Sequence, residues 1–128
     1  MVNKYEKVVV LCDLYNRFTL YMDKISLIYI TCSDKVEAKS IAKHLIKEKL
    51  VACANIIDNV ISIFEYDDKF CEEKEVILIL KTLSTHFEKV KNRVVELHSY
   101  DVPCIVEIDV SNSSKEFSNW LKNSIASI

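Results

Sequence analysis

The sequence of 128 residues contains no glycine and a single proline, Pro103. Glycine adopts positive φ more easily than any other residue, so sharp turns in this chain must use residues that carry a steric cost there. A glycine-rich phosphate-binding loop is therefore excluded. The chain also has no nucleophile elbow and no His-x-x-x-His pair. A Cys-His dyad would need geometry that two residue types alone do not supply, so we expect no enzyme.

Runs of one charge and long apolar segments are missing as well. The 17 basic and 19 acidic residues give a net charge of −2 without a basic tract, so no nucleic-acid partner is expected. Residues 8–12 are apolar, but this run is shorter than the roughly 7–15 residues of a signal peptide or the roughly 20 of a membrane span. We interpret residues 1–24 as an N-terminal extension of unassigned role and residues 25–128 as one domain, and we expect a cytoplasmic protein.

The cysteines do not form a recognisable framework. They are Cys12, Cys32, Cys53, Cys71 and Cys104. An odd number without any Cys-x-x-Cys pair argues against a set of disulfides and against a structural zinc site. We expect reduced thiols, several of them packed in the core as small hydrophobic side chains.

Hydrophobic periodicity and capping residues predict the element order β-α-β-β-α-β-α. Strands are expected over residues 25–30, 51–66, 75–80 and 103–110. Each helix follows a capping residue with glutamate three positions later, namely Asp34 with Glu37, Thr85 with Glu88 and Ser113 with Glu116. Two strand-helix-strand units joined by a hairpin predict an α+β fold. This is the ferredoxin-like split βαβ sandwich with an antiparallel sheet and an additional C-terminal helix.

The second predicted strand contains two irregular places. Asp58 and Asn59 interrupt its extended pattern and predict a bulge or bend. Residues 67–69 predict the hairpin tip, where Asp68 is expected at positive φ because no glycine is available.

The predicted strands also indicate that the protein is an oligomer. Residues 76–80 are apolar at five successive positions, and residues 25–30 are nearly as continuous. Such runs are typical of strands buried on both faces, whereas the predicted helices can cover only one. We therefore expect another subunit to cover the second face.

Several motifs, in order, resemble the CutA family of divalent-cation tolerance proteins. They are Thr31-x-x-Asp34, residues 48–56, the hairpin from Tyr66 to Glu75, Lys81-Thr82, Leu97-His98-x-Tyr100-x-Val102-Pro103 and Phe117-x-x-Trp120-Leu121. The resemblance implies a ferredoxin-like domain that assembles as a homotrimer, similar in architecture to the PII signalling proteins. It also implies a non-enzymatic role in divalent metal tolerance and homeostasis, with copper or another divalent cation weakly bound and no organic cofactor.

The sequence departs from the family pattern at several motif positions. Tyr66 and Asp68 replace the usual tryptophan and glycine of the hairpin, and Ser99 replaces a proline. Ile30 stands where some bacterial relatives have a cysteine proposed as a copper ligand, and Leu97 stands where some have a second histidine. The proposed copper ligands of those relatives therefore transfer poorly.

Two sets of candidate binding residues follow. His98 and Cys53 offer imidazole and sulfur to copper or zinc, although packing also explains Cys53 and the helix dipole also explains His98. In the second set, the resemblance implies that residues lining a cleft between subunits bind a small ligand: Glu72, Glu75, Lys81, Tyr100 and Trp120. A Glu75–Lys81 ion pair and an apolar helix face at Trp120 are the plainer alternatives.

Three functions remain open at this point. The first is a CutA-like trimer that binds a divalent metal ion. The second is a PII-like regulatory trimer that binds a small anion through Lys81, Tyr100 and Trp120. The third is a trimeric scaffold that presents residues 1–24 to a protein partner.

Overall fold

The protein is described by a computed structural model that covers residues 24–127. Its elements are β1 (Ile25–Cys32), α2 (Lys35–Lys47), β2 (Cys53–Tyr66), β3 (Lys69–Leu83), the short 3-10 helix η1 (Ser84–His86), α3 (Phe87–Leu97), β4 (Ile105–Asp109) and α4 (Lys115–Ser124). The four strands form one antiparallel sheet in the order β2-β3-β1-β4. The predicted α+β, ferredoxin-like fold with a C-terminal helix is confirmed. The predicted N-terminal extension, apart from Lys24, lies outside the described residues.

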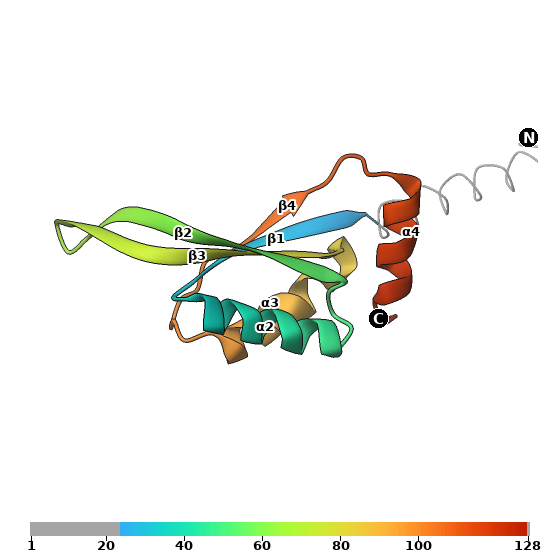
Figure 1. Cartoon of the computed structure of the whole chain (residues 1–128), viewed down its shortest axis with the longest axis horizontal. Coiled ribbons are helices and arrows are strands. Elements are labelled where there is room, and N and C mark those ends of the chain that lie inside the picture. Colours follow the sequence, from blue (N-terminus) through green and yellow to red (C-terminus); the bar gives the residue numbers. More distant parts are fainter. Residues whose placement is uncertain (1–23, 128) are drawn as a thin grey trace, which may run out of the picture.

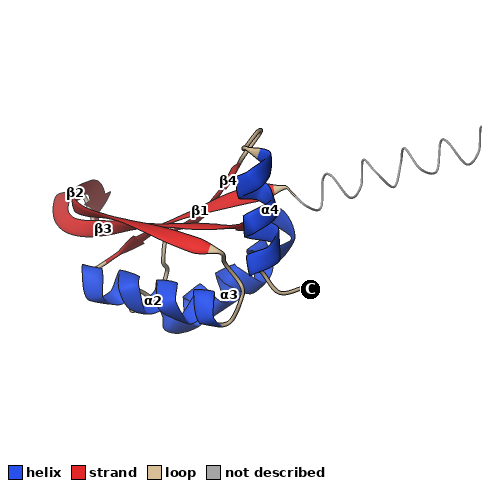
Figure 2. Ribbon diagram, turned by 45° about the vertical axis from the view of Figure 1, so that its right-hand side comes forward, coloured by secondary structure: helices blue, strands red, loops and turns tan. Residues whose placement is uncertain are grey.

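The sheet forms one layer, and α2 and α3 form the second (Figures 1 and 2). α4 stands at one end of the sheet, while the β2–β3 hairpin extends past the helices at the other (Figure 1). Every second residue of β1 and β3 points at the helices, because side chains alternate across a strand. The core between the layers contains Ile28, Ile30, Cys32, Leu78 and Leu80 from the sheet, and Ala38, Ile41, Leu45, Val90 and Val94 from the helices.

The predicted bulge and hairpin are confirmed. The β2–β3 pairing shifts between Ile57 and Val60, and Asn59 has φ of 59°. At the hairpin tip, Asp67 and Asp68 have φ of 53° and 59°. Two consecutive residues at positive φ are the mark of a type I′ turn, so the steric cost expected for Asp68 falls on both aspartates.

A fourth residue at positive φ ends α2. Lys49 has φ of 62°, its amide donates to the Ile46 carbonyl at 3.0 Å, and the Leu50 amide donates to the Leu45 carbonyl at 3.0 Å. These two bonds define a Schellman motif, in which glycine is the usual residue at the position of Lys49. The absence of glycine therefore leaves lysine in a left-handed conformation at a helix end.

One of the three predicted helix caps is confirmed. Asp34 accepts a hydrogen bond from the Glu37 amide at 2.8 Å and begins α2 as expected. The Thr85 cap was wrong, because Thr85 lies within η1 and contacts the ring of His86, which precedes α3 without a side-chain cap.

The predicted cap of α4 was wrong by one position. Ser114, rather than Ser113, accepts from the Phe117 amide at 3.3 Å. Both serines have a hydroxyl that can cap a helix, so side-chain chemistry alone does not decide which one precedes the first turn.

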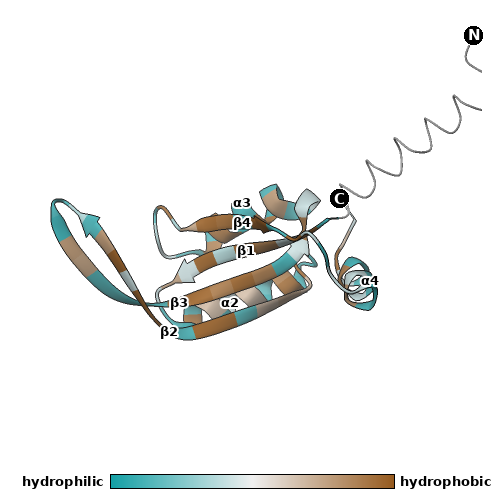
Figure 3. Cartoon of the chain, turned by 90° about the horizontal axis from the view of Figure 1, so that it is seen from above, coloured by the Kyte–Doolittle hydropathy of each residue, from teal (hydrophilic) through white to brown (hydrophobic). Residues whose placement is uncertain are grey.

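One face of the sheet is not covered by α2 and α3. We call it the open sheet face, and it comprises Leu27, Tyr29, Ile57, Ile77, Ile79, Val106 and Ile108, which alternate with the core positions. Figure 3 views the sheet from this side, with α2 behind the strands. Ile57, Val106 and Ile108 are each close to half exposed in the single chain. Among the described residues, no helix is long and apolar enough to span a membrane.

Candidate functional site

His98 follows α3 and reaches back to the end of β1. Its Nε2 donates to the carbonyl oxygen of Thr31 at 2.9 Å, and its Nδ1 accepts from the Tyr100 amide at 3.0 Å. These two partners assign the ring proton to Nε2, since Nδ1 faces a donor. The His98 side chain is fully buried. Both nitrogens are therefore already used, and freeing them from two neutral hydrogen bonds costs about 1–3 kcal/mol.

Glu37, in the first turn of α2, lies beside His98. Its Oε1 is 3.8 Å from His98 Nε2 and accepts from the Ser33 amide at 3.2 Å, while its Oε2 accepts from the Ser99 amide at 3.0 Å. Burial raises the pKa of this carboxyl, but the hydrogen bonds from Ser99 and Ser33 and the neighbouring His98 lower it more, so the pKa lies below its usual range. The Glu37 carboxylate thus connects the first turn of α2 to the residue after β1 and to the loop after α3 through two hydrogen bonds from backbone amides.

Cys32, the last residue of β1, completes a cluster with these two side chains. Its Sγ, a Glu37 carboxylate oxygen and a His98 ring nitrogen all lie within 4.8 Å of one another. Burial first, and then the charges of Glu37 and other carboxylates, raise the pKa of the Cys32 thiol to about 12. Sulfur, imidazole and carboxylate are ligand types of zinc and copper sites.

Sequence reasoning did not select Cys32 or Glu37 as ligands. The sequence predicts only reduced thiols for the cysteines, several of them in the core, and it predicts a first strand that ends at Ile30, two residues before Cys32. Glu37 was counted only as a capping residue. The short spacing of Cys32 and Glu37 could have indicated two neighbouring metal ligands. It does not by itself distinguish a metal site, because the third ligand, His98, comes beside them only in the folded chain.

Tyr100 and Glu75 form a second contact close to this cluster. The Tyr100 hydroxyl donates to Glu75 Oε2 at 2.9 Å, and the rings of Tyr100 and His98 are 4.7 Å apart between centroids. Burial, followed by the hydrogen bond to Glu75, raises the pKa of the Tyr100 phenol well above its usual value. Two of the predicted cleft residues therefore meet at the end of the sheet occupied by His98.

The remaining predicted cleft residues lie elsewhere. Lys81 Nζ is 5.6 Å from the centroid of the Phe117 ring, and the centroids of the Phe117 and Trp120 rings, both on α4, are 5.7 Å apart. Glu75 and Lys81 are six positions apart on β3, a distance of about 20 Å, so they form no ion pair. Glu72 is exposed on the hairpin opposite Ile63.

The structure does not bring the two predicted metal ligands together. Cys53 pairs with Lys81, whereas His98 bonds to Thr31, whose partner on β3 is Ile77. Ile77 and Lys81 are four positions apart on β3, which corresponds to about 13 Å along the strand. The sulfur beside His98 belongs to Cys32 instead.

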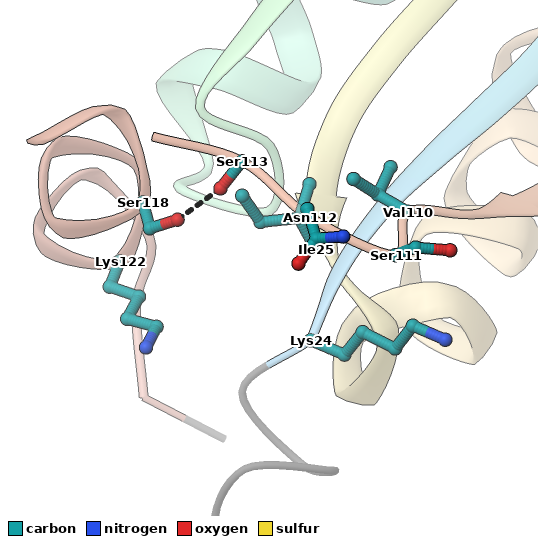
Figure 4. A pocket seen from close by; sticks show the side chains of 8 residues that line it. All are labelled: Lys24, Ile25, Val110, Ser111, Asn112, Ser113, Ser118 and Lys122. Atoms are coloured by element: carbon teal, nitrogen blue, oxygen red, sulfur yellow. Dashed lines mark hydrogen bonds between the residues drawn. The ribbon is translucent and has the colours of Figure 1, made fainter. Parts of the chain in front are cut away.

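A pocket beside α4 is separate from all of these residues (Figure 4). It is lined by Lys24, Ile25, Val110, Ser111, Asn112, Ser113, Ser118 and Lys122. Its volume of about 240 Å³ is below the roughly 300–1,000 Å³ of typical ligand pockets. None of the predicted ligand-binding residues lines it, so the cluster around His98 is the better-supported candidate.

Comparisons with known proteins agree with this fold. The family profile described as CutA1 divalent ion tolerance protein matches residues 26–124. Proteins named "Divalent-cation tolerance protein CutA" from Pyrococcus horikoshii and Thermus thermophilus are 40% and 37% identical over 95 residues, which is 74% of this chain and 92% of each relative. The crystal structure of CutA1 from Ehrlichia chaffeensis superimposes with a TM-score of 0.79 at 34% identity, covering 82% of this chain and 98% of that one. The chain belongs to the CutA1 family of divalent ion tolerance proteins.

Proposed function

We propose that this protein is a non-enzymatic homotrimer that binds a divalent cation, copper among the candidates, and acts in metal tolerance and homeostasis. The open sheet face is the observation that carries the proposal. Its apolar side chains include the half-exposed Ile57, Val106 and Ile108, and contiguous apolar surface of this kind marks an interface. A closed ring of subunits would bury it on every copy.

Additional apolar surface lies on the β2–β3 hairpin, which extends past the helices (Figure 1). Ile61, Ile63, Tyr66 and Phe70 are all more than 60% exposed in the single chain. An isolated two-stranded hairpin is marginally stable in water, so packing of this arm on a neighbouring subunit accounts for its length and composition.

The cation-binding part of the proposal rests on ligand chemistry. His98 supplies an imidazole, and cysteine supplies sulfur, the pair that copper and zinc favour. Because His98 is engaged by Thr31 and Tyr100, a bound ion must replace those hydrogen bonds, which accounts for weak binding. The predicted cytoplasmic location remains a prediction.

Light scattering tests the assembly, and titration calorimetry tests the cation. We expect a particle three times the 14.8 kDa chain mass, and heats of binding with cupric, cuprous or zinc ions that are absent in His98→Ala. The control is His44→Ala, an exposed histidine of α2 bonded only within its own helix, which retains the heats. A monomer, or a wild-type protein that gives no heat with any of the ions, contradicts the corresponding part of the proposal.

A PII-like regulator that binds a small anion is the second candidate. The predicted cleft residues fall into two separate groups, which favours a ligand site formed between two subunits. Glu75, which accepts from Tyr100, lies about 20 Å along β3 from Lys81, whose Nζ lies over the Phe117 ring beside Trp120. A site that uses both groups therefore needs two subunits. Thermal shifts with small anionic metabolites, lost in Lys81→Ala, would support this candidate, whereas a flat panel would count against it.

A further inference from the structure

We propose that Cys32, Glu37 and His98 form a metal centre for a thiophilic divalent cation such as Zn²⁺ or Co²⁺. The centre lies where the end of β1, the first turn of α2 and the residue after α3 meet. This inference rests on the proposed cation-binding function and deepens it. It names Cys32, rather than Cys53, as the sulfur ligand.

Three different donor atoms converge at this place in the fold. Among residues 24–127, this is the group in which three potential ligands from His, Cys, Asp and Glu approach so closely, with all donor atoms within 4.8 Å. Ligand bonds of about 2.0–2.3 Å in a tetrahedral site place donors roughly 3.5 Å apart. A contraction of about 1 Å would therefore close the site around an ion.

The surrounding backbone holds two of the three ligands, Cys32 and Glu37, in place. Cys32 lies within the β1–β3 ladder opposite Val76, and Glu37 is held by the amides of Ser33 and Ser99. Cys32 and His98 are buried, while the side chain of Glu37 is 14% exposed. Water is therefore excluded from two ligands, and Glu37 stands at the surface where an ion would enter.

The charges of the three ligands match those of a divalent cation. Binding releases the thiol proton of Cys32 to solvent, so a thiolate and the Glu37 carboxylate together contribute two negative charges. The His98 ring stays neutral, since the proton on Nε2 is given up and Nδ1 is protonated in its place. A dication is neutralised by this set, whereas a monovalent ion would leave a buried negative charge.

Ligation by His98 also changes the loop that follows it. With the ion on Nε2, the carbonyl of Thr31 loses its donor, and the amide of Tyr100 can no longer donate to a protonated Nδ1. The backbone at Tyr100 must therefore move when the ion binds. Three protein ligands leave a fourth coordination position for water or an exogenous group.

The experiment uses Co²⁺ alone as the probe on the full-length, reduced and metal-free protein. We expect one cobalt per chain, with the near-ultraviolet charge-transfer absorption of a thiolate ligand. Cys32→Ala should abolish that absorption, and Cys32→Ala and Glu37→Gln should each weaken binding at least about tenfold. Cys53→Ala, the matched control, should leave both the absorption and the affinity unchanged.

The possible failures are distinguishable. Retention of the absorption in Cys32→Ala, or its loss in Cys53→Ala, overturns this centre and leaves the proposed function standing. A wild-type protein that binds neither Co²⁺ nor Zn²⁺ overturns this centre, and one that also gives no heat with copper overturns the cation-binding part of the proposed function. Should Cys32→Ala not assemble, anomalous scattering from a cobalt-soaked wild-type crystal decides the question, because a peak beside Cys32 supports the centre and a peak elsewhere overturns it.

Discussion

The imidazole of His98 donates to the carbonyl oxygen of Thr31, 67 residues earlier in the chain, across 2.9 Å. This bond joins the end of α3 to the end of β1, where side chains of both elements enter one buried cluster. The same ring accepts from the amide of Tyr100. Both ring nitrogens of His98 therefore stabilise the fold, and a metal ion that binds either nitrogen must replace a hydrogen bond to the backbone.

Replacing His98 by alanine should destabilise the fold by about 2–4 kcal/mol. The change leaves the Thr31 carbonyl and the Tyr100 amide without their partner, and each unpaired buried group costs about 1–3 kcal/mol. Denaturant unfolding at fixed protein concentration measures the loss. His44→Ala, at an exposed helical position, should stay within about 0.5 kcal/mol. Equal effects of the two variants would contradict the structural role of His98.

Replacing Lys49 by glycine should stabilise the protein by about 0.5–1 kcal/mol. Lys49 has φ of 62°, where a residue with a Cβ carries a steric cost of about 1–2 kcal/mol. Glycine removes that cost, but it loses more backbone entropy on folding, so only part of the free energy is gained. The control is Lys47→Gly in the last turn of α2, which should destabilise by about 1 kcal/mol. Thermal and denaturant unfolding should show a more stable Lys49→Gly protein and a less stable Lys47→Gly protein. Destabilisation by both substitutions would contradict the strain at Lys49.

Replacing Val106 by glutamate should convert the proposed trimer into monomers. Val106 lies on the open sheet face, where burial of a charge against a second subunit is strongly unfavourable. Val95→Glu is the matched control, because Val95 on α3 has the same 49% exposure. Light scattering should give the chain mass for the first variant and the trimer mass for the second. A trimeric Val106→Glu protein would place the interface elsewhere.

The phenol of Tyr100 should ionise later than the other tyrosines. Burial and the hydrogen bond to Glu75 raise its pKa, so the absorbance difference between wild type and Tyr100→Phe should develop only above the usual range near pH 10. Glu75→Gln should lower the pKa of Tyr100 part of the way, since burial remains. A difference spectrum that titrates like free tyrosine would exclude the observed contact.

Glu37 should make stability fall in acid. Its pKa in the folded state is below the unfolded value, so its contribution is present above the unfolded pKa of about 4.3 and is lost as pH falls through the folded pKa. Wild type should therefore be more stable than Glu37→Gln at pH 7, and the difference should shrink at pH 3. A difference that does not change with pH would show that the charge of Glu37 is unimportant.

Much of the fold could be predicted from local patterns. Runs of β-branched and aromatic residues identified the strands, and helical periodicity identified α2, α3 and α4. The apolar run of residues 76–80 indicated a second sheet face that another subunit would cover. The bulge at Asp58 and Asn59 followed from the same kind of evidence. The cap predicted at Thr85 failed because Thr85 lies inside the helical turn η1, where its hydroxyl contacts the ring of His86.

The sequence by itself determined the element order, the family motifs and the unusual turns of a glycine-free chain, because these depend on neighbours within a few residues. Only the tertiary structure decided which cysteine lies beside His98. Cys32 and His98 are 66 residues apart in the sequence. In the fold, the side chain of Cys32 lies on the helix-facing side of the sheet, next to the imidazole of His98 at the end of α3. By its chemistry alone, Cys53 was an equally plausible sulfur ligand beside His98. The register of β2 against β3 places Cys53 about 13 Å along the sheet from the position of Thr31, to which His98 bonds.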